Sequence, residues 1–81
     1  MPHKSTQYAG DRALAALGHA LRELRREHGL SQEVLAVDAE VERSYLGAIE
    51  RGEVNLTVMV LSRICRALKL RPSELLAKAK L

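Results

Sequence analysis

Residues 31–52, SQEVLAVDAEVERSYLGAIERG, decide the fold of this 81-residue chain. Ser31 is a good helix cap, because its hydroxyl can accept a hydrogen bond from a free amide of the first turn. Glu33, just inside, suits the positive end of the helix dipole. We therefore expect a short helix over residues 32–39.

A second helix follows after a tight turn through residues 40–42. Leu46 and Ile49 resume helical spacing and point the same way. Gly52 is the usual residue for a left-handed helix end, so this helix should span residues 42–50. Apolar side chains should pack the two helices together, namely Val34, Leu35, Ala36 and Ala39 from the first and Leu46 and Ile49 from the second.

The second helix has a small, polar and basic face opposite its apolar pair, since successive residues are turned by about 100°. Two helices joined by a turn, the second with such a face, are typical of the helix-turn-helix, whose second helix enters the DNA major groove. That face carries Ser44, Gly47, Ala48 and Arg51, flanked by Arg43 and Tyr45.

The chain resembles the lambda-repressor-like (Cro/repressor, XRE-type) helix-turn-helix family over about residues 14–76. The matching residues are Gln32, Leu35-Ala36, Leu46 and Ile49-Glu50-Arg51-Gly52. Arg43-Ser44-Tyr45, the Ile49–Gly52 run and Asn55-Leu56-Thr57 also resemble the controller proteins of restriction-modification systems, a branch of that family. The resemblance implies a sequence-specific DNA-binding regulator of transcription.

The composition fits one small all-α domain over residues 11–81, a compact bundle of about five short helices. Apolar residues make up 47%, and without Trp or Phe the core must be aliphatic. Asp11 and Gly29 should bound a first helix, Thr57 should cap a fourth, and Pro72 should begin the last. The apolar stripes of the first and fourth helices are Leu14, Leu17, Leu21 and Leu24, and Leu61, Ile64, Cys65 and Leu68.

Residues 1–10, MPHKSTQYAG, have no apolar period and predict a flexible arm, although His3 and Lys4 could touch phosphates. No stretch resembles a signal-peptide core or a membrane span. The single cysteine, Cys65, cannot form an intramolecular disulfide and falls on an apolar stripe, so it should lie in the core. We expect a cytoplasmic, nucleoid-associated protein.

No enzyme chemistry is indicated. His19 and His28 share no face with acidic or cysteine partners at metal spacing. The chain shows no nucleophile-base arrangement and no phosphate-cradling glycine loop. We therefore expect no metal, no cofactor, no evident small-molecule ligand and no membrane partner.

The candidate DNA contacts divide by chemistry. Arg43 can bond bidentately to guanine, Ser44 can donate or accept, and the Ala48 methyl can pack on thymine. Tyr45 and Arg51, at the flanks, suit sugar and phosphate instead. The remaining candidates are Gly47, which would let the backbone approach the groove, Gln32, whose family position contacts the DNA backbone, and Asn55, which matches another such position.

Two functions remain open at this stage. One is a DNA-binding regulator, a homodimer on a pseudo-palindromic operator; the other is a helical protein-interaction module that keeps the fold without binding DNA. The net charge of +3 suits a polyanion without demanding one, and an ordinary solvated helix face would look similar. Arg43 and Arg51 favour DNA, whereas Glu42 and Glu53 weaken the field. Leu75, Leu76 and Leu81 exceed what one small core needs, which suggests dimerisation through the last helix.

Two further expectations rest on the resemblance. Family members that match at Arg25 and Glu50 carry a partly buried ion pair there. The family usually has Gly at the position of Glu40, because the turn needs a left-handed backbone. Glu40 should therefore adopt a positive φ if the turn is kept.

Overall fold

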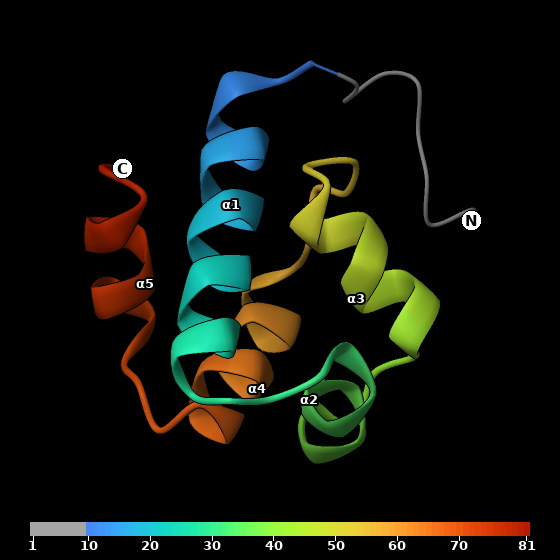
Figure 1. The fold of residues 1–81 in the computed structure, drawn as a ribbon. Coiled ribbons are helices and arrows are strands. Elements are labelled where there is room, and N and C mark those ends of the chain that lie inside the picture. Colours follow the sequence, from blue (N-terminus) through green and yellow to red (C-terminus); the bar gives the residue numbers. More distant parts are fainter. Residues whose placement is uncertain (1–9) are drawn as a thin grey trace.

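The computed structural model describes residues 10–81, which form five helices and no strand. Their bounds are α1 Arg12–Glu27, α2 Gln32–Ala39, α3 Arg43–Glu50, α4 Val58–Ala67 and α5 Pro72–Lys78. The all-α bundle expected from the sequence is confirmed. In Figure 1, α1 runs through the middle of the molecule, with α5 on one side and α3 on the other. The predicted flexible arm, with His3 and Lys4, lies outside the described residues except for Gly10.

The helices begin where the sequence indicates. Asp11, Ser31 and Thr57 each accept a hydrogen bond from a backbone amide three residues on, at 3.0, 3.1 and 3.1 Å. Pro72 occupies the first position of α5, and the Glu74 carboxylate accepts from the Arg71 amide at 3.0 Å. Side chains thus satisfy amides that have no partner within their helix.

All five helices end in the same way, at a residue with positive φ. In α2 that residue is Glu40, with φ 57°, as expected from the family resemblance. Its amide donates to the Val37 carbonyl at 3.1 Å, and the next amide, of Val41, donates to the Ala36 carbonyl at 2.9 Å. This pair of bonds is the Schellman motif. The equivalent residues of the other helices are Gly29, Gly52, Lys69 and Lys80.

The core is aliphatic and takes side chains from every helix. Its fully buried members are Leu21, Leu35, Leu46, Ile49, Ile64, Cys65, Leu68 and Leu75. Cys65 lies there as expected, and burial together with the nearby Glu74 charge raises the pKa of its thiol to about 11. Val34 was expected to join the α2–α3 contact, but it is 46% exposed. Within residues 10–81, no helix has the length and apolar character that crossing a bilayer requires.

Helix α3 packs closely against α1. A Cβ atom at Gly18 would lie 2.4 Å from the Ile49 carbonyl oxygen and 2.6 Å from that of Glu50. A Cβ at Gly52 would meet the Ala15 Cα at 2.7 Å. Because these obstacles are backbone atoms, which cannot rotate away, the two glycines set how closely the end of α3 approaches α1.

Glu40→Gly should stabilise the fold. A residue with a Cβ adopts a left-handed backbone at a cost of about 1–2 kcal/mol of folding free energy, and glycine removes this cost. Glycine also makes the unfolded chain more flexible, which offsets part of the gain in stability. We expect the urea midpoint to rise at constant m-value, by an amount equivalent to at most about 1 kcal/mol.

Asp38→Gly is the matched control, because the exposed Asp38 lies in the helical part of α2. Glycine there has the same effect on the unfolded chain but relieves no strain, so the midpoint should fall. An unchanged or lower midpoint for Glu40→Gly would show that the turn is not strained at this residue.

Candidate nucleic-acid interface

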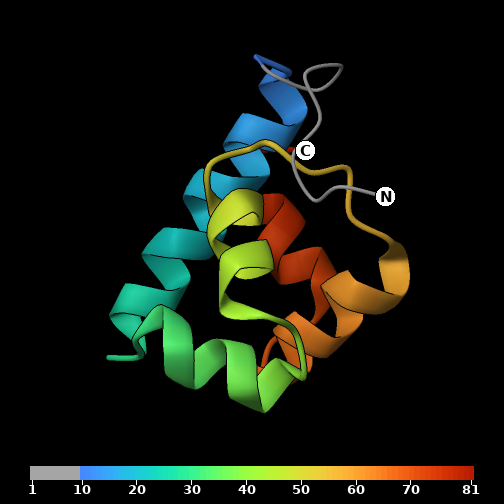
Figure 2. The same ribbon diagram turned by 90° about the vertical axis from the view of Figure 1, so that its right-hand side faces the viewer.

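Polar side chains from the start of α2 and from both ends of α3 come together on one surface. Figure 2 shows the backbone of the two helices, with α3 facing the viewer and α2 below it. We call it the α2–α3 face and define it by Gln32, Arg43, Ser44 and Arg51. Arg43, Ser44 and Arg51 are exposed, and Gln32 is half-buried. The helix pair thus brings side chains far apart in sequence to a common surface.

Two of the predicted contacts on α3, Ala48 and Gly47, are buried. Ala48 is only 2% exposed and belongs to the core, so its methyl group cannot reach a thymine. Gly47 is also buried, and a Cβ there would lie 3.2 Å from Arg51 Nη1 and 3.7 Å from Gln32 Oε1. In the free protein, glycine at this position makes room for the side chains of Arg51 and Gln32, which cover it.

Of the predicted contacts Tyr45, Arg51 and Asn55, only Arg51 belongs to the α2–α3 face. Tyr45 is half-buried and packs against the core. Arg51 is exposed, and its Nε donates to Glu53 Oε1 at 3.2 Å. Asn55 is exposed in the loop between α3 and α4. These places suit contacts with the sugar-phosphate backbone better than with base edges.

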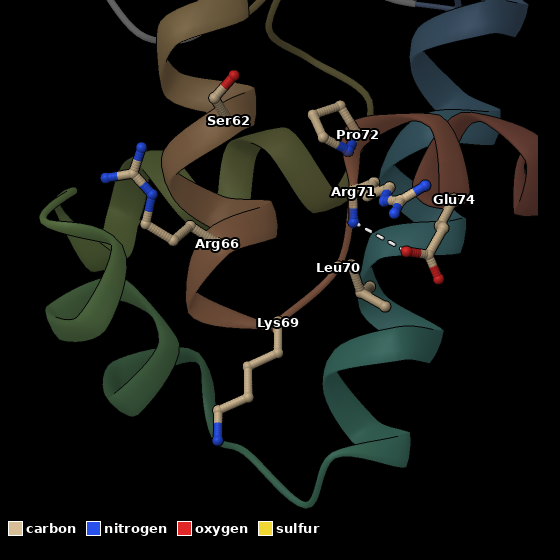
Figure 3. Close-up of a pocket in the computed structure, with 7 residues that line it drawn as sticks. All are labelled: Ser62, Arg66, Lys69, Leu70, Arg71, Pro72 and Glu74. Atoms are coloured by element: carbon tan, nitrogen blue, oxygen red, sulfur yellow. Dashed lines mark hydrogen bonds between the residues drawn. The ribbon is translucent and has the colours of Figure 1, made fainter.

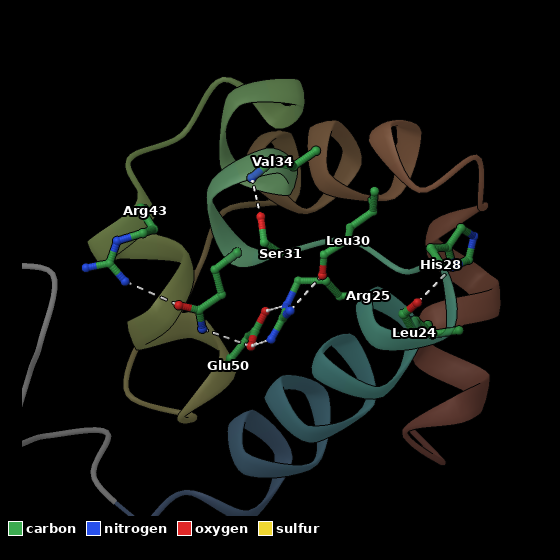
Figure 4. A network of polar contacts seen from close by, with 9 residues as sticks. Leu24, Arg25, His28, Leu30, Ser31, Val34, Arg43 and Glu50 are labelled. Carbon is green, nitrogen blue, oxygen red and sulfur yellow. Dashed lines mark hydrogen bonds and ion pairs between the residues drawn. The ribbon is translucent and has the colours of Figure 1, made fainter.

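Behind the face lies the ion pair that the resemblance implied, between Arg25 of α1 and Glu50 of α3 (Figure 4). Arg25 Nε donates to Glu50 Oε2 at 2.7 Å, and Arg25 Nη2 donates to Oε1 at 3.0 Å. The side chains are 9% and 2% exposed. Arg25 Nη1 also donates to the Leu30 carbonyl at 2.8 Å, just before α2 begins. The pair therefore joins α1, α3 and the start of α2.

Polar contacts continue from this pair to the surface. Gln32 Nε2 donates to Glu50 Oε1 at 3.1 Å, and Arg43 Nη1 donates to Gln32 Oε1 at 3.4 Å. No buried side-chain nitrogen or oxygen in residues 10–81 lacks a hydrogen-bond partner. The sequence analysis predicted the ion pair and a role for Gln32, but it did not predict the hydrogen bonds that join Gln32 to Glu50 and to Arg43. These residues are far apart in the sequence, and no local spacing relates them.

A second basic region lies where α4 meets α5, away from α3. Figure 3 shows its shallow hollow, lined by Ser62, Arg66, Lys69, Leu70, Arg71, Pro72 and Glu74. The charged ends of Arg66, Lys69 and Arg71 point in different directions there and do not converge on one point. The described part of the chain also holds no cluster of three His, Cys, Asp or Glu residues suited to a metal ion.

Comparison with known proteins gives consistent matches. The profile of the family described as "Helix-turn-helix domain" matches residues 16–78. Control protein C.BamHI of Bacillus amyloliquefaciens is 35% identical over 60 residues, covering 73% of this chain and 74% of that protein. The crystal structure of the restriction-modification controller C.AhdI from Aeromonas hydrophila is 44% identical, with a TM-score of 0.76, covering 76% of this chain and 94% of that one. The clp gene regulator ClgR from Corynebacterium glutamicum is 32% identical, with a TM-score of 0.82, covering 84% and 72%.

A double-mutant cycle on Arg25 and Glu50 should show strong coupling in urea unfolding. Arg25→Met or Glu50→Leu alone leaves a buried charge without its partner, which should cost about 3–5 kcal/mol. The double variant should cost much less than the sum. If a single variant does not fold, recovery of folding in the double variant reports the same coupling.

The Arg51–Glu53 pair is the matched control. Its side chains are 59% and 19% exposed, so solvent screening should limit its coupling to about 1 kcal/mol or less. A coupling for Arg25 and Glu50 no larger than this would contradict a structural role for the buried pair.

Proposed function

This chain belongs to the helix-turn-helix domain family of DNA-binding transcriptional regulators, and we propose that it inserts the first turn of α3 into the major groove of duplex DNA. The exposed pair of Arg43 and Ser44 at that turn carries the proposal. Arg43 can bond bidentately to guanine O6 and N7, and Ser44 can donate to or accept from a base edge. The named relatives of this chain are regulators and not enzymes.

Contacts with phosphate would surround this centre. Gln32 is in the first turn of α2, where free amides and the positive helix end favour an anion. Arg51, Tyr45 and Asn55 would reach sugar and phosphate on either side of the groove. The net charge of +3 agrees with a polyanionic partner. Such a regulator would act in the cytoplasm, associated with the nucleoid.

The alternative, a helical protein-interaction module without DNA binding, has less support. It would leave the exposed Arg43 and Ser44 without the base edges that suit their chemistry. The matched relatives include control proteins and gene regulators, and the family match covers residues 16–78, which include the whole α2–α3 face.

A homodimer completes the proposal, because two-fold symmetry lets such domains read half-sites about 34 Å apart on a pseudo-palindrome.

The exposed apolar residues that could form the dimer interface differ from those expected from the sequence. Leu75 is fully buried and Leu76 packs against the core, so the expected surplus of leucines on the last helix was wrong except for Leu81, which is 57% exposed. Val58 and Met59, at the start of α4, are 74% and 72% exposed. In a dimer that pairs the starts of two α4 helices, these apolar side chains would lose contact with water.

Binding should be to duplex DNA and strongly salt-dependent, because Lys and Arg contacts with phosphate release counterions. Gel shifts against random-sequence duplexes, followed by selection of the bound sequences, would give the preferred site. The logarithm of the affinity should then fall linearly with the logarithm of salt concentration. Failure to retain any duplex at low salt would overturn the proposed function.

Arg43 and Arg51 should behave differently when replaced. Arg43→Ala should cost about 1–3 kcal/mol of binding and relax the preference at one base pair. Arg51→Ala should weaken binding to all sequences alike and reduce the salt slope. Equal losses on every duplex for Arg43→Ala would remove this residue from base readout.

Sedimentation at about tens of micromolar should show the dimer if its interface is of ordinary strength. Met59→Glu should give a monomer, because it would place a charge in an apolar contact. Val37→Glu, at a similarly exposed position on α2, should leave the dimer intact. A protein that stays monomeric and still binds DNA as a monomer would contradict the dimer.

A further inference from the structure

We propose that Glu53 competes with DNA for Arg51. In the free protein the Glu53 carboxylate holds the Arg51 guanidinium back along α3, and a phosphate of the duplex takes the place of this carboxylate when DNA binds. The proposal rests on the function above, in which Arg51 contacts phosphate. It gives Glu53 a defined part in setting the affinity for every duplex, beyond its negative charge beside the interface.

Arg51 lies back along α3 in the free protein. Its Nε donates to Glu53 Oε1 at 3.2 Å. Its Nη1 reaches back one turn, where a Cβ at Gly47 would lie 3.2 Å from it. The guanidinium edge formed by Nε and Nη2, which Arg25 uses for its two bonds to Glu50, also matches two oxygens of one phosphate. Arg51 cannot offer that edge to phosphate while its Nε is bonded to Glu53.

Glu53 is the fixed partner of the two. Its side chain is 19% exposed, against 59% for Arg51. Its amide donates to the Ala48 carbonyl at 3.0 Å, as part of the Schellman motif that ends α3. The preceding Gly52 packs against α1, since a Cβ there would meet the Ala15 Cα at 2.7 Å. The carboxylate therefore stays in place, and the long exposed arginine is the partner that moves.

The charge density of DNA favours the exchange. An exposed ion pair is weak, because water and salt screen the attraction between its two charges. Duplex DNA carries one negative charge per about 1.7 Å of its axis, counting both strands. With α3 in the groove, Arg51 is attracted by several phosphates at once, whereas Glu53 offers one carboxylate. Part of the binding free energy is nevertheless lost, because the pair with Glu53 must first be broken.

This cost should be the same for every sequence. Arg51 contacts phosphate in the proposed complex, and phosphates carry no direct sequence information. Base preference comes instead from Arg43 and Ser44. Glu53 should therefore lower the affinity for all duplexes by one factor and leave the preferred site unchanged.

Glu53→Gln tests the exchange, because glutamine keeps the shape of the side chain and removes its charge. Affinity should rise about threefold to tenfold, on the preferred duplex and on random duplexes alike. In an Arg51→Ala background the same change should give a smaller rise, since it then removes only the repulsion between Glu53 and phosphate. Urea midpoints would confirm that each variant is folded.

Glu33→Gln is the matched control. It removes the same charge from an exposed position in the first turn of α2. Because this change leaves the Arg51–Glu53 pair intact, its effect on affinity should be the same with and without Arg51.

The difference between the two rises for Glu53→Gln measures the cost of breaking the pair. It should match the coupling between Arg51 and Glu53 in urea unfolding, because both cycles compare the pair formed with the pair broken. Equal rises in the two backgrounds would show that Glu53 acts by repulsion alone, which would overturn the proposal while DNA binding stands. If no duplex is bound at all, the proposed function fails and the exchange fails with it.

NMR relaxation of the arginine Nε–Hε groups tests the hold on Arg51 without DNA. Glu53→Ala, which removes both the charge and the acceptor, should increase the mobility of Arg51 in the free protein. Arg25 should keep its order, because its bonds to Glu50 are unchanged. An Arg51 signal equally mobile in both proteins would overturn the proposal even if DNA binding is confirmed.

Discussion

The buried Arg25–Glu50 pair is the interaction on which the position of α3 depends. Its two side chains are taken out of water, and a buried charge is tolerated only with a partner in good geometry. Any shift of α3 along or away from α1 would separate these buried charges and therefore cost free energy. Arg25 extends the constraint to α2 through the Leu30 carbonyl. The backbones also pack closely at Gly18, between the same two helices. The ion pair and the steric fit therefore favour the same arrangement of α3 on α1.

This arrangement leaves little of α3 free for recognition. Of its eight residues, the last five are buried. The helix packs against both α1 and α2, and within it only Arg43 and Ser44 are exposed. One short helix thus serves as core and as reader. Its C-terminal part anchors it in the core, and its first turn presents Arg43 and Ser44, the two residues proposed to reach base edges.

Local signals in the sequence predicted most of the fold. Caps at Asp11, Ser31 and Thr57 and glycines at helix ends act within a few residues, so the sequence shows them directly. Contacts between helices were predicted less well. A helical wheel divides α3 into two faces, whereas two neighbouring helices cover it, which is why the wheel places Ala48 and Gly47 on the open face although both are buried. Periodicity likewise gave no sign that Leu75 is fully buried.

The turn before α3 shows how packing overrides local preference. Glu40 takes a left-handed backbone that a residue with a Cβ adopts at a cost, and Lys69 and Lys80 do the same after α4 and α5. At Glu40 the two Schellman hydrogen bonds remain, and Val41 packs against the core directly after it. Because neither the Schellman hydrogen bonds nor the Val41 contact uses the side chain of residue 40, they fix the direction in which the chain enters α3. The place of Arg43, three residues further on, is therefore set by the packing of α2 on α3 and not by the conformational preference of the turn residue.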